Sequence, residues 1–355
     1  MGLPEINIEF KTKAETAVTR SARGIVALIL TDTTSTEDLS GAYAYEADVP
    51  KDNWSVKNQD YIKKTFLGTP NKVLIERRIV PENGYNGVLT RLKNKEWNYL
   101  TVPGIADDDV QSVYDWILEQ RAAKKTFKAV LPCKSADVAA NHEGVINFAT
   151  ENIQVGGVTY TSAEYCCRIA GLLAGTPMTE STTYSVLAEI DSIKESETPD
   201  EDIDQGMFIL INDGSKIKIG RGVNSLHILS DHKTEDMMKI KIIEAIDLMR
   251  DDIRTTFEQN YIGINNSYDN KMLFIAAVNQ YFDNLASEGI LDKEADNSAD
   301  IDVEAQRRWL ASKYDVSEYS DDEIRKAKTG SYLFVNAHVA FLDAIEDLFF
   351  SVLMQ

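Results

Sequence analysis

Apolar runs alternate with amphipathic segments through the first half of the chain. Residues 24–30 are continuously apolar, which is typical of a strand covered on both faces. This alternation favours a parallel or mixed sheet with right-handed crossovers, and hence the α/β class. The expected strands are 24–30, 72–80, 99–102 and 127–131, and the expected helices are 56–65, 85–95 and 107–124.

Helical patterns dominate the second half of the chain. Asn212-Asp213-Gly214 lies between two short apolar runs and predicts a β-hairpin. The expected fold class is therefore α/β with mixed α+β character, in a chain of several domains. The expected helices are 161–174, 234–260, 271–288 and 302–313.

Both ends of the chain carry strand patterns, although terminal segments are usually polar and poorly ordered. A short apolar strand on a sparse connector cannot bury its own face. It must dock on its own sheet or add to the sheet edge of a neighbouring chain, and the pattern leaves both alternatives open. The residues that share a face are Ile6, Ile8 and Phe10 near the start, and Leu348, Phe350 and Val352 near the end.

The charge narrows the classes of partner. The chain has 355 residues with 37 Lys+Arg, 57 Asp+Glu and a formal charge of −20. Such a length predicts two or three domains, and such a charge disfavours both nucleic acid and anionic membranes. No apolar run is long enough for membrane insertion. Cys133, Cys166 and Cys167 form no disulfide framework and are expected to be small buried residues of a chain made in the cytoplasm.

Catalytic signatures are missing from the sequence. His142-Glu143 has no second histidine at the spacing of zinc proteases, and no phosphate-binding loop or nucleophile elbow occurs. The acidic segments 200–206 and 292–300 break the calcium-loop pattern. A pair of catalytic carboxylates is left open, but no catalytic, metal or cofactor residue is singled out, and no cofactor is expected.

Four segments, in their order and spacing, match a known family. They are 2–8, 14–27, 242–263 and 329–347. With these segments the chain resembles the tail sheath proteins of contractile phage tails, phage-like elements and R-type bacteriocins. The resemblance implies a non-enzymatic virion or particle protein, made in the cytoplasm and released in an assembled particle by lysis.

The resemblance also implies partners and a mechanism. Sheath subunits form hexameric rings that stack helically around a tail tube protein, between a baseplate and a tail terminator protein. Contraction of the sheath drives the tube through a target cell envelope. The extended N- and C-terminal arms insert strands into the C-terminal α/β domains of neighbouring subunits and complete these domains. This assigns strand exchange to Ile6, Ile8, Phe10, Leu348, Phe350 and Val352. No nucleic acid and no membrane insertion is implied.

The resemblance suggests a domain organisation. The expected parts are an N-terminal arm 1–23, an N-terminal α/β region 24–90, an outward-facing middle domain 91–232, a tube-facing assembly domain 233–343 and a C-terminal arm strand 344–355. The basic tube-facing helix of some relatives is not obvious here. The candidates are Arg307, Arg308 and Lys313, followed by Lys326 and Lys328.

Two other classes compete with the sheath interpretation. An α/β enzyme that binds a nucleotide or another small molecule would have its site at the carboxyl ends of the strands. That reading requires the terminal strands to fold back onto their own subunit. A non-contractile tube or capsid protein is the other alternative, and the expected helices 107–124 and 234–260 count against it.

Overall fold

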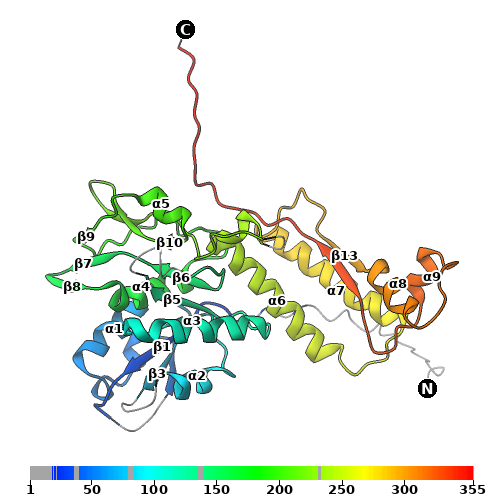
Figure 1. Ribbon diagram of the computed structural model, residues 1–355, viewed down its shortest axis with the longest axis horizontal. Coiled ribbons are helices and arrows are strands. Elements are labelled where there is room, and N and C mark those ends of the chain that lie inside the picture. The colour runs from blue at the N-terminus through cyan, green and yellow to red at the C-terminus, as the bar shows by residue number, and fades with distance from the viewer. Residues whose placement is uncertain are drawn as a thin grey trace, which may run out of the picture. The chain divides into compact units, whose positions relative to one another are not determined.

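The structure, a computed structural model, describes residues 18, 20, 22–35, 40–78, 84–133, 140–230 and 233–354 (Figure 1). The chain divides into two compact units. The sheet unit comprises Ala22–Leu248 together with Asp343–Gln355. The helical unit comprises Met249–Leu342 together with Met1–Ser21.

A seven-stranded mixed sheet organises the sheet unit, with the strand order β10-β6-β5-β4-β1-β3-β2. β1 pairs in parallel with β3 and with β4, whereas β2 pairs antiparallel with β3. This confirms the predicted mixed sheet, and strands from both 24–90 and 91–232 take part in it. The strands are β1 (Ile25–Thr31), β2 (Ser40–Tyr43), β3 (Lys72–Arg78), β4 (Tyr99–Thr101), β5 (Lys128–Pro132), β6 (Val145–Phe148) and β10 (Met207–Phe208).

Alternate residues of β1 enter two hydrophobic cores on the two faces of the sheet. Val26 and Leu28 pack in one core with residues of α1 and α4. Ala27 and Ile29 pack in the other core with residues of α2 and α3. Cover on both faces explains why this strand is continuously apolar, as predicted. The helices are α1 (Val56–Phe66), α2 (Asn86–Leu92), α3 (Asp107–Ala122) and α4 (Ser162–Gly175).

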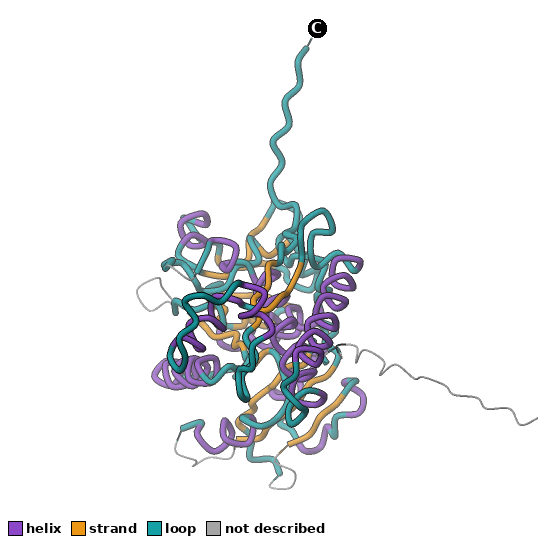
Figure 2. Tube along the Cα trace, turned by 90° about the vertical axis from the view of Figure 1, so that its right-hand side faces the viewer, coloured by secondary structure: helices purple, strands orange, loops and turns teal. Residues whose placement is uncertain are grey.

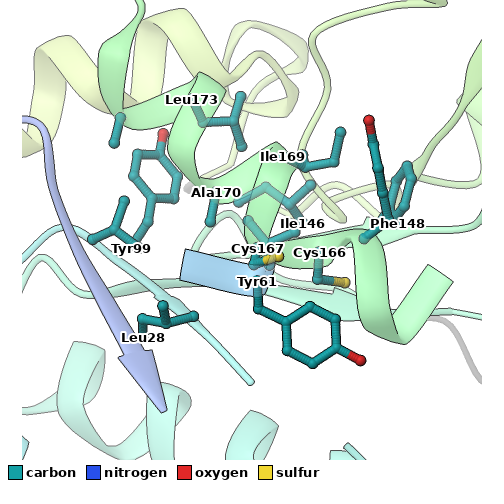
Figure 3. Close-up of a cluster of buried hydrophobic side chains, with 14 of the residues drawn as sticks. Leu28, Tyr61, Tyr99, Ile146, Phe148, Cys166, Cys167, Ile169, Ala170 and Leu173 are labelled. Atoms are coloured by element: carbon teal, nitrogen blue, oxygen red, sulfur yellow. The ribbon is translucent and has the colours of Figure 1, made fainter. Parts of the chain in front are cut away.

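Helix α4 packs closely against α1. Its Cys166 and Cys167 are buried and free, as predicted, and lie in the core that also contains Tyr61 (Figure 3). A Cβ at Gly171 would lie 2.0 Å from the carbonyl oxygen of Thr65. The glycine therefore allows the two helix backbones to approach each other at this point.

Smaller elements complete the sheet unit. The predicted hairpin around Asp213 is confirmed as β11 (Leu210–Asn212) and β12 (Ile217–Ile219). A three-stranded sheet and a short helix were not predicted. They are β7 (Glu151–Val155), β8 (Val158–Tyr160), β9 (Ser192–Lys194) and α5 (Pro199–Asp204).

The predicted helix 234–260 begins later than expected. Residues 235–238 form a 3-10 turn, because the loop at Asn224 binds the carbonyl oxygens of Met237 and Met238. Helix α6 (Ile240–Asn260) then contributes residues up to Leu248 to the sheet unit and the rest to the helical unit. The other helical-unit elements are α7 (Tyr268–Ser287), β13 (Ser298–Ile301), α8 (Val303–Ala311), α9 (Asp321–Lys326) and β14 (Val335–His338).

Candidate assembly surfaces

The C-terminal tail, residues 343–354, exposes a run of large apolar side chains. The tail is extended and pairs with no strand in the described part of the chain (Figures 1 and 2). The predicted C-terminal strand therefore has no partner in its own chain, and its apolar faces remain in water. Exposure lies between 67% and 98% for Ile345, Leu348, Phe349, Phe350, Val352, Leu353 and Met354.

The beginning of this tail is anchored on the sheet unit. The Glu346 carboxylate accepts hydrogen bonds from the hydroxyls of Ser181 at 2.7 Å and Thr183 at 2.5 Å. The Glu346 side chain is only 7% exposed. The apolar residues that follow thus leave the subunit from a fixed point.

An antiparallel ribbon of β13 and β14 lies in the helical unit. Asp302 donates its N–H to the Phe334 carbonyl, so these two opposed residues form a hydrogen-bonded pair. Hydrogen-bonded and non-hydrogen-bonded pairs alternate along an antiparallel ribbon. The backbone N–H and C=O groups of the pair Ala299 and Ala337, three positions further on, therefore point away from the ribbon. The side-chain amide of Asn279 on α7 donates to the Ala299 carbonyl at 3.1 Å and accepts from the Ala299 N–H at 2.7 Å. A side chain therefore occupies the outer edge of β13.

The outer edge of β14 differs from that of β13. Its outward backbone groups belong to Val335 and Ala337, and they form no hydrogen bond within the described part of the chain. The residues of β14 are also largely exposed. An edge with unpaired N–H and C=O groups is a template for an added strand.

The predicted N-terminal strand with Ile6, Ile8 and Phe10 lies outside the described residues. The described Arg20 contacts the helical unit. Its guanidinium lies 3.1 Å from Glu288 and 3.5 Å from Asp252, and 5.9 Å from the centre of the Tyr281 ring. The end of the N-terminal segment is thus attached beside α6 and α7 within that unit.

The five cationic candidates lie on or near α8 and α9. Arg307, Arg308 and Lys326 pair with carboxylates of their own unit at 2.8, 3.8 and 2.7 Å. Lys313 lies 4.1 Å from the ring centre of Trp309, and Lys328 is exposed. Residues 298–330 carry eight carboxylates against six cations, so this surface is not basic overall.

A buried cluster of charges fixes the start of α6 to the sheet. Asp247 is fully buried and accepts from Arg121 at 3.0 Å and Lys128 at 3.1 Å. Lys128 also pairs with Glu244 at 2.8 Å, which pairs with Arg23 at 2.6 Å. Burial alone would raise the pKa of Glu244, but the charges of Lys128 and Arg23 hold that pKa well below its usual range. No local sequence signal predicted this cluster.

The carboxyl end of β1 is occupied by a structural carboxylate. Asp32 accepts from the N–H groups of Thr34 and Ser55 at 2.7 and 2.8 Å and from the Asn58 amide at 2.6 Å. Burial would raise the pKa of Asp32, but these hydrogen bonds hold it far below its usual range. A fixed negative charge at the start of α1 disfavours the phosphate site of a nucleotide-binding enzyme.

Among the described residues, no cluster of His, Cys, Asp or Glu is arranged to hold a metal ion. The enzyme alternative requires the terminal strands to fold onto their own subunit, whereas residues 348–354 of the C-terminal tail do not. Across the same described residues, no helix combines the length and apolar character that a membrane span requires.

Two family models match the chain. The phage tail sheath protein central domain matches residues 55–225, and the phage tail sheath C-terminal domain matches residues 232–355. A tail sheath protein of Clostridium phage phiCD119 is 37% identical over 360 residues, covering 98% of each chain.

Solved structures share the fold. The helical sheath protein of the anti-feeding prophage, in its contracted state, has a TM-score of 0.73 at 13% identity and covers 100% of both chains. The sheath tail protein of Desulfitobacterium hafniense has a TM-score of 0.68 at 15% identity and covers 84% of this chain and 94% of its own.

Proposed function

We propose that the terminal segments of this chain, which belongs to the phage tail sheath family, join neighbouring subunits by strand exchange. The chain is a structural subunit of a contractile sheath. The work of contraction would come from subunit contacts that differ between two packings of the same folded chain, without a cofactor or catalytic turnover.

The observation that carries the proposal is the exposed apolar tail. Leu348, Phe350 and Val352 alternate on one face of an extended segment, and all three lie in water in the free chain. Burying one such side chain contributes about 1.5–3 kcal/mol. A tail that stays uncovered on its own subunit is therefore best explained by cover from another copy.

The receiving surface that fits this tail is the outer edge of β14. An extended segment can bond the outward groups of Val335 and Ala337 as an added strand. A donor on one subunit and an acceptor on the next form a heterologous contact, which generates rings or helical stacks. Hexameric rings stacked helically would be one such assembly.

The N-terminal segment is proposed as a second arm. Its apolar face would consist of Ile6, Ile8 and Phe10, and Arg20 would mark the point at which this arm joins the helical unit. Both arms would survive contraction as permanent links, since rings without links would separate.

Further partners follow from the family. The subunit would surround a tail tube protein and meet baseplate and tail terminator proteins, without nucleic acid or membrane insertion. Baseplate structures of the anti-feeding prophage contain chains of the same fold. The chain would be made in the cytoplasm as a non-enzymatic part of a phage tail or an R-type bacteriocin particle.

The tube-facing surface is proposed to use the cations least engaged with their own unit. Arg308 is 72% exposed in its long ion pair, and Lys328 is exposed. Arg307, Lys313 and Lys326 would take part after exchanging their present partners. An acidic surface of the tube would fit these five side chains despite the acidic surroundings.

The proposed domain organisation keeps the two arms at the ends. They would be residues 1–23 and 344–355. Between them, an N-terminal α/β region 24–90 and an outward-facing middle domain 91–232 would precede a tube-facing assembly domain 233–343.

The test compares purified full-length subunit with three variants by sedimentation and negative-stain microscopy. The variants lack residues 1–20, lack residues 348–355, or carry Ala337→Pro, which removes an outward N–H from β14. We expect folded monomers that form no cylinders. A tail of unchanged length, with its apolar residues replaced by serine, controls for length. Long cylinders from the chain without 348–355 would overturn the proposal.

A further inference from the structure

We infer that residues 343–347 form a releasable latch that holds the root of the C-terminal tail on its own sheet unit. The latch presents the tail for docking, and so this inference rests on the proposed strand exchange. Three acidic residues of one short segment each meet a complementary group of the sheet unit. The latched segment is acidic, whereas the tail beyond it is apolar.

Two ion pairs flank the buried anchor at Glu346. Arg221 donates to Asp347 at 2.7 Å, and Lys239 forms a hydrogen-bonded ion pair with Asp343. Arg221 also lies 3.6 Å from Glu346. The neighbouring carboxylates raise the pKa of Arg221, Asp347 first among them, so this guanidinium stays charged at any working pH. The latch is therefore charged on both sides.

The latch is built to open. Its two ion pairs are partly exposed, with side-chain exposures of 29% to 57%, and pairs of this kind hold weakly. They are also screened by salt. Glu346 is held by neutral hydroxyls together with Arg221, so the anchor weakens when Arg221 is lost.

Opening would change the length of the arm. With the latch closed, the free tail begins at Leu348, and eight residues at about 3.3 Å each reach about 26 Å. With the latch open, the free segment begins at Asp343, because Leu342 still donates its N–H to the Ile290 carbonyl. Thirteen residues then reach about 43 Å.

A fixed root favours docking because it removes the entropy of a longer linker. The closed latch raises the effective concentration of the tail near one acceptor edge and restricts its direction. The open latch provides slack when neighbouring subunits change their packing. The same strand could thus remain docked while its link lengthens.

A glutamate-specific protease tests the latch in the free full-length subunit. Cleavage after Glu346 releases residues 347–355, and intact-mass spectrometry identifies that loss. Cleavage requires the latched state to open, so its rate follows the open population. We expect the double substitution Arg221→Ala/Lys239→Ala, the latch variant, to raise this cleavage rate about tenfold. The matched control is Lys194→Ala/Lys216→Ala, which removes two exposed lysines of the same unit, and it should cleave at the wild-type rate.

Salt provides a second arm of this test. Raising the salt to about 1 M should accelerate cleavage of the wild type and leave the latch variant nearly unchanged. Equal cleavage rates for wild type, latch variant and control would overturn the latch. Circular dichroism should show that all variants are folded.

Assembly separates the latch from strand exchange. We expect the latch variant to form the same cylinders as the wild type, but with a critical concentration raised several-fold, because the tail itself is intact. Loss of cylinders on deleting 348–355, together with a latch variant that assembles like the wild type, would refute preorganisation and keep strand exchange. Cylinders from the tail deletion would instead refute strand exchange, while the protease result would still judge the latch.

Discussion

Replacing Phe350 by Asp should separate folding of the subunit from its assembly. Phe350 is 80% exposed in the free chain, so an aspartate at this position meets water on nearly every side. We expect the free energy of unfolding to change by less than about 0.5 kcal/mol, as for other surface substitutions. The variant should be purified as a monomer with an unchanged circular dichroism spectrum.

The effect on assembly should be large. Docking of the tail would cover both faces of the strand, and the aspartate forgoes the burial of Phe350, about 1.5–3 kcal/mol. Burying a carboxylate without a partner adds several kcal/mol. A combined loss of at least about 4 kcal/mol weakens each junction by about a thousandfold. No cylinders should then form at any practical concentration.

The assay is sedimentation with negative-stain microscopy at concentrations where the wild-type chain assembles. The matched control is Val56→Asp, because Val56 is 84% exposed and a carboxylate in the first turn of α1 is tolerated. The control should assemble normally. Cylinders of Phe350→Asp at the wild-type concentration would show that this side chain stays in water in the assembly, and the argument for a covered tail would be lost.

Three further predictions concern the sheet unit. Asp247→Asn should lower the free energy of unfolding by about 3 kcal/mol in denaturant titrations, because the buried cations Arg121 and Lys128 each lose one of their carboxylate partners, whereas the exposed Glu119→Gln should change nothing measurable. Burial lowers the pKa of His142 to about 4. Between about pH 6.5 and 4, the His142 imidazole therefore binds a proton in the unfolded chain but stays neutral in the folded chain. Stability should therefore fall by about 3 kcal/mol as the pH drops through that window, and His142→Asn should flatten this part of the profile; an unchanged slope would refute it. Gly171→Ala should destabilise by about 1–3 kcal/mol, because its Cβ would clash with the Thr65 carbonyl, and an unchanged melting temperature would contradict that contact.

The parts of the fold that the sequence predicted are those whose cause is local. The run 24–30 became β1 because both of its faces are covered, and 107–124 became α3 because its apolar spacing suits one buried face. Strand β13 was missed because Ser298–Ile301 lies in an acidic stretch without clear alternation. The tail was predicted as a strand and is extended, but a strand needs a partner that its own chain does not supply.

The candidate surfaces were predictable only in part. The apolar tail was visible in the sequence, since alternation along Leu348, Phe350 and Val352 needs no tertiary information. The latch was not, because Ser181 and Glu346 lie 165 residues apart and neither belongs to a motif. The cationic candidates came from the resemblance, through the basic tube-facing helix of some relatives. The Asp321 carboxylate that pairs with Arg307 lies 14 residues away in the chain, and this pairing appears only in three dimensions.

The amide of Asn279 makes the outer edge of β13 less accessible to an added strand than the outer edge of β14. This difference would impose an order on assembly. A first incoming strand would meet the open groups of β14 and displace nothing. A second strand, at β13, would first have to break both hydrogen bonds that Asn279 makes to Ala299. Each subunit would therefore bind two incoming strands in sequence, first at the edge of β14 and then at the edge of β13.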